Sequence, residues 1–169
     1  MSQLVGLLSR RGEDVAKPLL KMLGETRLRH DAFGIATPRG AEHSPKSLEF
    51  TSLTSSVALA HRLIKVHPTD NPQPLHDGDR AIAFLGRLSD ISEPSIAAAA
   101  NILKKRVREG YRELLTEHEG HWVSAIAEDD TITCARENIG SLPLYYAINE
   151  ELIALSTDMK TLLRLGMEP

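Results

Sequence analysis

Residues 119–162 decide the fold, and their sequence is EGHWVSAIAEDDTITCARENIGSLPLYYAINEELIALSTDMKTL. Apolar and β-branched runs alternate here with turns such as Glu128-Asp129-Asp130 and Asn149-Glu150, a pattern typical of short β-strands. Strands are predicted over residues 121–127, 131–136, 143–148 and 151–155, and a helix over 158–165. Because too little chain separates the strands for crossover helices, we expect consecutive antiparallel hairpins.

The remaining sequence adds strands and two more helices. A helix is predicted from Asp14, its N-cap, to Leu23, since apolar residues recur on one helical face. A second helix is predicted to start at Ser92-Glu93-Pro94 and to run toward Gly110. Further strands are predicted over 3–8, 32–37, 46–50, 56–63 and 80–85, with an ordered surface loop over 68–79. These elements indicate an α+β layered sandwich of mainly antiparallel sheets, forming a single domain over residues 1–169.

Composition excludes several classes of function. The 20 basic and 23 acidic residues give a net charge of −3, which provides no electrostatic footprint for nucleic acid or an anionic membrane. No apolar run approaches the roughly 20 residues that span a bilayer, and no secretory signal is visible, so a cytoplasmic protein is expected. Cys134 is the single cysteine, which rules out an intramolecular disulfide, and its apolar neighbours predict a small buried strand residue.

No motif in the sequence indicates a cofactor or a metal. Glycine-rich phosphate loops are absent, and the segment His118-Glu119-Gly120-His121 lacks the spacing of a zinc-binding helix. We therefore expect a surface turn there, with Gly120 starting a strand, and no bound metal.

Several motifs occur in an order that resembles one known family. They are ARENIG at 135–140, PLYY at 143–146 and STDMKTL at 156–162, preceded by MSQLVG at 1–6, RHDAFGI at 29–35, AHRL at 60–63, QPL at 73–75 and IAFLG at 82–86. Together they resemble the glutaminase domain, a class II amidotransferase, of asparagine synthetase, whose corresponding patterns include "H.RL", "NG" and "ARD..G..PLYY". The resemblance implies the fold of N-terminal nucleophile hydrolases, a four-layer αββα sandwich.

The resemblance also implies a catalytic role for residue 2. In the family the initiator methionine is removed, a cysteine then attacks the glutamine amide, and its own α-amine accepts the proton. A free α-amine has a pKa of about 7.7–8.0, which suits this role near neutral pH. Ser2 stands at the cysteine position, so it is either a serine nucleophile, which requires removal of Met1, or merely a small residue after the initiator.

Other positions of the implied site are only partly retained. The backbone N–H of Gly86 corresponds to an oxyanion donor, but Leu85 replaces the family asparagine and Arg87 replaces a glutamate. Asp90 aligns with an asparagine near the substrate. Arg62, followed by Leu63, aligns with an arginine that pairs with the glutamine carboxylate, although it is equally explained as an ordinary rim arginine. Near Glu93-Pro94-Ser95 nothing matches the family aspartate that binds the substrate ammonium.

Two functions therefore remain open. One is an amidotransferase-like domain that has lost glutaminase activity and serves as a binding or regulatory subunit for an amino-acid-like small ligand. The other is an active amide hydrolase with Ser2 as nucleophile. Since the sequence stops near the point where asparagine synthetases continue into their ATP-using domain, a synthetase-like partner or a homo-oligomer is also expected.

Overall fold

The computed structural model describes residues 2–23, 30–46, 50–92, 95–104 and 106–167. The elements follow the order β1 (Gln3–Ser9), α1 (Ala16–Leu23), β2 (Ala32–Thr37), β3 (Gly40–Ser44), β4 (Val57–Leu63), β5 (Leu75–Asp77), β6 (Arg80–Leu88), α2 (Ser95–Leu103), α3 (Val107–Thr116), β7 (Gly120–Glu128), β8 (Thr131–Arg136), β9 (Tyr145–Ile148), β10 (Leu152–Ser156) and α4 (Met159–Leu163). Within these residues, no helix combines the length and the apolar character needed to span a membrane.

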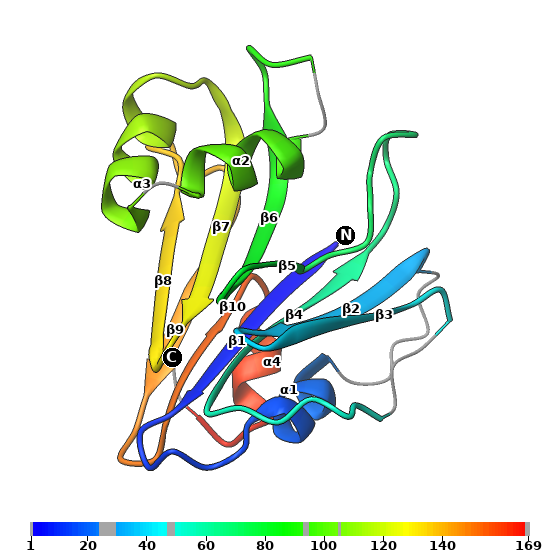
Figure 1. Cartoon of the computed structure of the whole chain (residues 1–169), viewed down its shortest axis with the longest axis vertical. Helices are drawn as coiled ribbons and strands as arrows, with labels where there is room; N and C mark the ends of the chain where they lie inside the picture. The colour runs from blue at the N-terminus through cyan, green and yellow to red at the C-terminus, as the bar shows by residue number, and fades with distance from the viewer. Residues whose placement is uncertain (1, 24–29, 47–49, 93–94, 105, 168–169) are drawn as a thin grey trace.

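The strands form two antiparallel sheets. The larger has six strands in the order β3-β2-β4-β1-β10-β9, and the smaller has four in the order β5-β6-β7-β8. Helices α1 and α4 cover the large sheet, and α2 and α3 cover the small one (Figure 1). The four-layer αββα sandwich of two antiparallel sheets expected from the sequence is thus confirmed.

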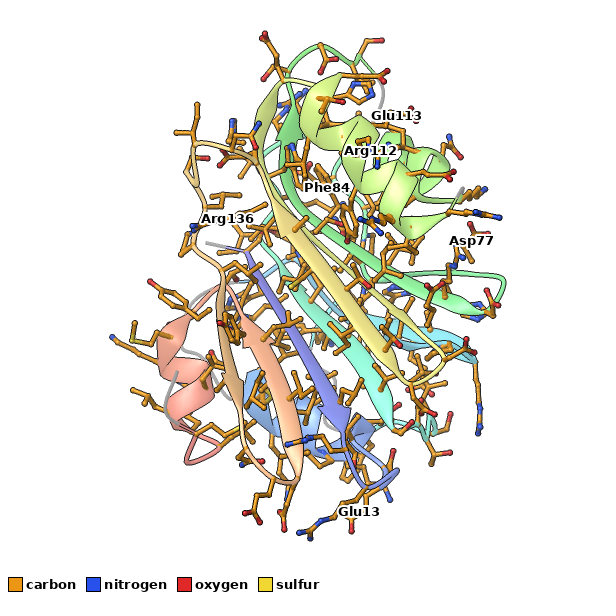
Figure 2. The ribbon with its side chains drawn as sticks, turned by 90° about the vertical axis from the view of Figure 1, so that its left-hand side faces the viewer. Glu13, Asp77, Phe84, Arg112, Glu113 and Arg136 are labelled. Carbon is orange, nitrogen blue, oxygen red and sulfur yellow. The ribbon has the colours of Figure 1, made fainter. Side chains whose placement is uncertain are left out.

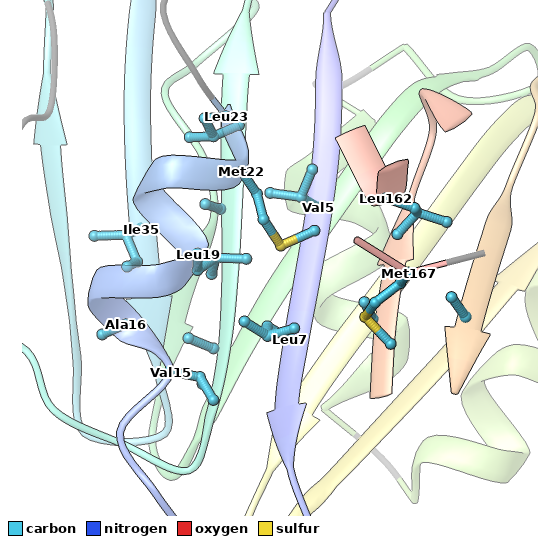
Figure 3. Packing of buried hydrophobic residues seen from close by; sticks show 14 residues of the cluster. Val5, Leu7, Val15, Ala16, Leu19, Met22, Leu23, Ile35, Leu162 and Met167 are labelled. Atoms are coloured by element: carbon cyan, nitrogen blue, oxygen red, sulfur yellow. The ribbon is translucent and has the colours of Figure 1, made fainter. Parts of the chain in front are cut away.

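Three apolar clusters hold the layers together. Alternation along β1 divides its side chains, so that Val5 and Leu7 pack under α1 and α4 (Figure 3), while Leu4 and Leu8 face the small sheet. Small residues such as Ala83 fill the space between the sheets. Burial on both faces explains why the central strands have continuous apolar sequences.

The third cluster lies between the small sheet and its helices. Phe84 and Trp122 stack with ring centroids 5.7 Å apart, and Leu103 and Leu114 from the two helices pack in the same cluster. Figure 2 shows Phe84 on the small sheet near α3, which carries Arg112 and Glu113.

The single helix predicted from residue 92 toward Gly110 is wrong. Two helices occupy this region, because α2 ends at Leu103 and α3 begins at Val107. Gly110 lies within α3, where a Cβ atom would approach the Ile102 carbonyl oxygen to 2.8 Å. The glycine that was expected to end one helix instead lets two helices pack closely.

Three smaller predictions also differ from the structure. The strand predicted over 46–50 is not found at its two ends, because Lys46 and Phe50 lie outside any strand; residues 47–49 fall outside the described residues. The neighbouring strand is β3, which ends at Ser44. The predicted loop over 68–79 contains the short strand β5. Cys134 does lie on a strand but is exposed, because β8 is the outermost strand of its sheet.

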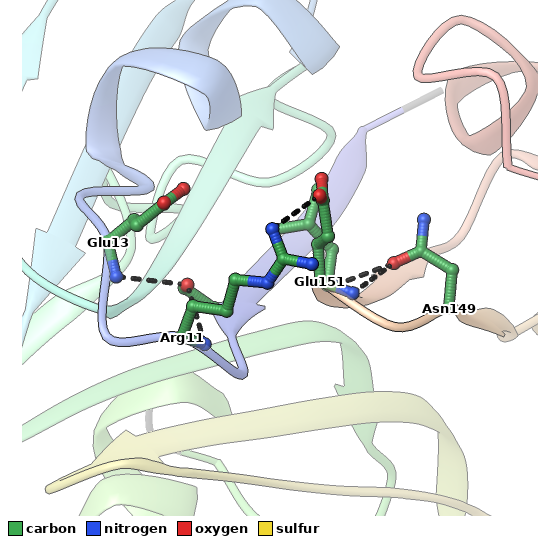
Figure 4. A network of polar contacts seen from close by, with 6 residues as sticks. Arg11, Glu13, Asn149 and Glu151 are labelled. Carbon is green, nitrogen blue, oxygen red and sulfur yellow. Dashed lines mark hydrogen bonds and ion pairs between the residues drawn. The ribbon is translucent and has the colours of Figure 1, made fainter.

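The turns at one end of the large sheet share polar contacts. Arg11 pairs with Glu151 at 2.7 Å, and the Ser9 hydroxyl accepts from the backbone N–H groups of Arg11 and Glu13 (Figure 4). Nearby, Asp14 Oδ1 accepts from the backbone N–H of Ala16 at 3.2 Å at the start of α1, one residue before Val15, whose carbonyl accepts the first helical hydrogen bond. The ion pair is exposed, so it adds at most about 1 kcal/mol to stability.

Glu137 organises the turn within the ARENIG motif. One carboxylate oxygen accepts from the backbone N–H groups of Ile139 and Gly140 at 2.7 and 2.9 Å. The other accepts from the Ser141 hydroxyl and backbone N–H at 2.6 and 2.5 Å. The hydrogen bond from the Ser141 hydroxyl, together with those from the three backbone groups, lowers the pKa of Glu137 to about 2.

We therefore expect Glu137→Gln to change how stability depends on pH. A carboxylate whose pKa is lowered by folding stabilises the native state above its unfolded pKa, and this stabilisation is lost as pH falls from about 4.5 toward 2. The difference in urea midpoint between wild type and Glu137→Gln should be largest at pH 7 and shrink through this window. Glu150→Gln removes the same charge from an exposed turn and serves as the control. A difference that stays constant with pH would contradict this role for Glu137.

Candidate functional site

A cavity of about 360 Å³ opens beside the N-terminal end of β1. Its wall combines Ser2 just before β1, the end of β4 and the segment after it, residues 84–87 of β6, and single residues from α2, β7 and two loops. The lining residues are Ser2, His61, Leu63, Ile64, Val66, His67, Thr69, Asp70, Asn71, Gln73, Phe84, Leu85, Gly86, Arg87, Ser92, Ile96, His121 and Leu142.

The segment after β4 is anchored to both sheets. The side-chain oxygen of the buried Gln73 accepts from the backbone N–H of Phe84 at 2.8 Å, which attaches the segment to β6. On the large sheet, Gly34 leaves room for it, since a Cβ atom there would lie 2.0 Å from the Gln73 carbonyl oxygen. His43 Nε2 also lies 2.8 Å from the Pro74 carbonyl oxygen. The QPL motif thus fixes one wall of the cavity.

Ser2 lines the cavity, but its hydroxyl is hydrogen-bonded to the backbone of Ile64, the residue that follows β4. Ser2 Oγ donates to the Ile64 carbonyl oxygen at 3.1 Å and accepts from the Ile64 backbone N–H at 2.9 Å. A serine that attacks an amide must pass its proton to a base. In this arrangement the proton points to a carbonyl oxygen, so attack requires the hydroxyl to rotate first.

Gly86 occupies a position on β6 that accepts only glycine. Its φ is +111°, and a Cβ atom would lie 2.0 Å from the His121 carbonyl oxygen. Its neighbours Leu85 and Arg87 also line the cavity, so the structure brings together Ser2, Gly86 and both substituted positions. Leu85 offers hydrocarbon where the resembled family has an amide donor.

Arg62 and Leu63 lie on opposite faces of β4. Side chains alternate along a strand, and Ala58 and Ala60 pack toward α1, which places Arg62 on the helix side of the large sheet. Its Nη1 donates to the Leu23 carbonyl oxygen at 3.1 Å, and burial is the main cause that lowers its pKa. Leu63 lines the cavity, whereas Arg62 is not among the lining residues.

The position of Arg62 follows from the spacing of its motif. In the "H.RL" pattern one residue separates histidine from arginine, so both would point to the same face of a strand. Here His61 and Arg62 are adjacent, and only the histidine faces the cavity.

His61 is the site residue that the sequence did not single out. Its side chain is 1% exposed, lines the cavity, and has no hydrogen-bond partner for either ring nitrogen among the described residues. Burial lowers the pKa of His61 to about 3, so the ring is neutral at physiological pH. The AHRL motif contained this residue, but only the register of β4 with Leu4 and Gly34 shows which face it occupies.

Asp90 is not among the residues that line this cavity. Its carboxylate lies 2.9 Å from His118 Nδ1, and this hydrogen bond is the main cause that lowers the pKa of Asp90. Gly120 begins β7 as expected, and His121 lines the cavity. The described residues contain no group of three or more histidine, cysteine or acidic side chains arranged to hold a metal ion. Glu93 and Pro94 lie outside the described residues.

Two antiparallel sheets between helical layers, with a cavity at the start of the first strand, define the fold of N-terminal nucleophile hydrolases. Residues 60–164, well over half of the chain, match the family described as "Glutamine amidotransferase domain". The chain belongs to this family.

Solved structures share the fold at low sequence identity. The glutamine phosphoribosylpyrophosphate amidotransferase from B. subtilis, complexed with ADP and GMP, matches with a TM-score of 0.79 and 16% identity over 98% of this chain and 44% of that one. A structure described as the allosteric regulatory enzyme of purine biosynthesis matches with a TM-score of 0.77 and 15% identity over 98% and 43%. The chain thus spans less than half the length of either. Comparison with curated protein sequences gave no match.

Proposed function

We propose that this chain is a class II amidotransferase-like domain that no longer hydrolyses glutamine and acts as a ligand-binding or regulatory subunit. The carrying observation is the state of Ser2, whose hydroxyl both donates to and accepts from the backbone of Ile64. Serine is a weaker nucleophile than the cysteine of the resembled family, and these two hydrogen bonds hold it away from attack.

Changes around Ser2 support the same proposal. Leu85 removes a side-chain donor from the implied oxyanion hole, a loss that typically costs about 10²–10³ in rate. Leu63 lines the cavity, while the guanidinium of Arg62 lies on the helix side of the sheet and bonds Leu23. A glutamine carboxylate would therefore lack the arginine partner that the resemblance implies.

The second candidate is an amide hydrolase that uses Ser2 as nucleophile. One observation favours it: Ser2 and Gly86, a position that only glycine can occupy, line the same cavity. The reaction needs a free α-amine on Ser2, so Met1 must be removed, and it needs the hydroxyl to leave Ile64. Its substrate would be an amide other than glutamine.

We also propose that the chain is cytoplasmic and is of the asparagine synthetase type, because it contains the ARENIG and PLYY motifs. A synthetase-like partner or a second copy of the chain would cover the edge at β9, the outermost strand of the large sheet. Tyr146 and Ile148 of this strand are exposed. Size-exclusion chromatography with light scattering, together with affinity capture from native extract, tests for this partner or second copy. Finding only free monomer would count against both.

Glutamate release from glutamine tests the proposed function. We expect wild type, Ser2→Ala and Ser2→Cys to give the same background rate, because Leu85 and Leu63 still leave the substrate unsupported. Intact mass spectrometry must first show whether Met1 is absent in each sample. Release by wild type that is lost in Ser2→Ala would favour the hydrolase instead. Release gained in Ser2→Cys would show that the rest of the site is competent.

A further inference from the structure

The two sheets end at different places on the side of the sandwich away from β3 and β5. In the small sheet, β5 lies against β2 and β3, β6 and β7 lie against β4, and the outermost strand, β8, lies against β1. The large sheet continues past β1 with two more strands, β10 and β9. This side of the molecule is therefore a step, in which the large sheet extends two strands beyond the small one.

The step exposes apolar side chains of β9. Ala147 packs under the helices, so the alternating residues Tyr146 and Ile148 face the layer of the small sheet. They pair in register with Leu155 and Ile153 of β10, which pack in the cluster between the sheets. Tyr146 and Ile148 are nevertheless 66% and 57% exposed, because the small sheet ends at β8.

The outer edge of β8 directs its backbone groups away from its own sheet. The backbone N–H of Glu137 donates to the Trp122 carbonyl oxygen at 3.1 Å, and hydrogen-bonded pairs alternate along an antiparallel ladder. The backbone groups of Ile132 and Cys134 therefore point away from β7. Their side chains face the large sheet, since Ile132 packs in the cluster between the sheets and side chains alternate along a strand.

The outer edge of β9 has the same arrangement. The backbone N–H of Asn149 donates to the Leu152 carbonyl oxygen at 3.0 Å, so the backbone groups of Tyr146 and Ile148 point away from β10. On both strands, the residues with outward backbone groups are thus those whose side chains face the space between the layers. Antiparallel partners direct their side chains to the same face, so β8 and β9 match as partners with their apolar side chains inside.

We infer that two copies of the chain interlock at this step, with β9 of each copy pairing antiparallel to β8 of the other. The arrows of β1 and β8 point in opposite directions (Figure 1), and β9 runs with β1 because both are antiparallel to β10. A two-fold axis parallel to the strands and midway between the layers therefore places β9 of one copy antiparallel to β8 of the other. The same axis lays β9 and β10 of one copy over β10 and β9 of the other, which fills both steps.

The apolar surface at the step is large enough for a stable dimer. Four side chains on β9 and the adjoining α4 are 42–66% exposed, on the order of 100 Å² each: Tyr146, Ile148, Met159 and Leu163. They account for about half of the roughly 800 Å² that each partner buries in an interface of standard size, and the two strand edges add to it. Strand β9 has no charged residue and β8 has Arg136 at its end, so pairing buries little charge.

This inference rests on the proposed function, in which the chain acts as a subunit, and it names a second copy as the partner. It does not depend on the cavity, because Ile132, Cys134, Tyr146 and Ile148 are not among the residues that line it.

A cross-link through the native cysteine tests the pairing. We expect the register in which Ile132 lies opposite Ile148 of the other copy, since it joins two β-branched apolar side chains. Cys134 then lies opposite Tyr146 of the other copy, with Cα atoms about 5.5 Å apart, a separation that suits a disulfide. Within one copy the two residues lie on sheets about 10 Å apart, so their disulfide forms between copies.

Mild oxidation of Tyr146→Cys should therefore give a covalent dimer, with residues 134 and 146 joined in the peptide identified by mass spectrometry. Tyr146→Cys combined with Cys134→Ser is the matched control and should give no covalent dimer.

Light scattering during size-exclusion chromatography, from micromolar to millimolar protein, measures the dimer itself. Wild type and Cys134→Ser should have the mass of two chains. Cys134→Lys places a charge on the edge of β8 that faces the other copy, and should raise the dissociation constant at least about tenfold. Cys134 is exposed, so the variant should keep its fold, which circular dichroism checks. If it does not fold, the cross-link carries the test.

Three results each overturn the inference: monomeric wild type over the whole concentration range, absence of the cross-link between residues 134 and 146, or a folded Cys134→Lys with an unchanged dissociation constant. A different protein captured by a monomeric chain also overturns it but leaves the subunit role in place. Glutamate release is measured in the same samples, and Ser2-dependent release defeats the proposed loss of hydrolysis whatever the oligomeric state.

Discussion

Trp122→Ala is expected to lower the free energy of unfolding by about 3–5 kcal/mol, the usual cost of removing a fully buried large aromatic side chain. Trp122 is 0% exposed, stacks on Phe84, and packs in the cluster that joins the small sheet to α2 and α3. Domains of this kind have total stabilities of about 5–15 kcal/mol, so the variant should lose a large part of its stability. Urea unfolding followed by circular dichroism measures the effect.

Trp122→Phe is the matched control. The indole N–H of Trp122 is buried without a hydrogen-bond partner among the described residues. Phenylalanine removes this N–H but keeps a ring against Phe84, so the lost volume is partly offset by the removal of an unsatisfied donor. We expect a much smaller loss than for alanine. Equal losses in the two variants would mean that ring packing does not hold the helices to this sheet.

Gly86→Ala is expected to lower the free energy of unfolding by roughly 2–6 kcal/mol, the sum of backbone strain and overpacking. The φ of +111° disfavours any residue with a Cβ, and that atom would lie 2.0 Å from the His121 carbonyl oxygen and 2.8 Å from the Trp122 Cα. Both contacts are to backbone, which can move only by separating β6 from β7. Thermal and urea unfolding of the variant measure the loss.

Gly78→Ala separates strain from close packing. Gly78 also has a positive φ, +66°, but a Cβ there would meet nothing within 4 Å. This control should therefore cost only about 1 kcal/mol, the penalty of the left-handed conformation alone. If Gly86→Ala were no more destabilising than Gly78→Ala, the close approach of β6 and β7 at Gly86 would be refuted.

The sequence predicted the layers of the fold better than its details. Alternation and acidic turns located the hairpins of residues 119–162, because these signals are local. The break between α2 and α3 was missed, since Gly110 indicates a helix end from sequence and only the contact with Ile102 shows that it is a packing site. Exposure of Cys134 depends on strand order, which hydropathy alone does not reveal.

The candidate site was predicted unevenly for a similar reason. Ser2, Gly86 and Leu63 were singled out and line one cavity, whereas Arg62 and Asp90 are not among the lining residues. A shift of one residue along a strand reverses the face of every side chain. His61 escaped notice because its burial and unsatisfied nitrogens arise from three strands and the segment after β4, which are distant in sequence.

The central claim is that this amidotransferase-family cavity has lost glutamine hydrolysis. Its most direct test is glutamate release from glutamine by protein whose intact mass shows that Met1 is absent, so that the α-amine of Ser2 is free. We predict a rate equal to that of Ser2→Ala prepared in the same way. Glutamate release well above that of Ser2→Ala would contradict the claim and establish Ser2 as a working nucleophile.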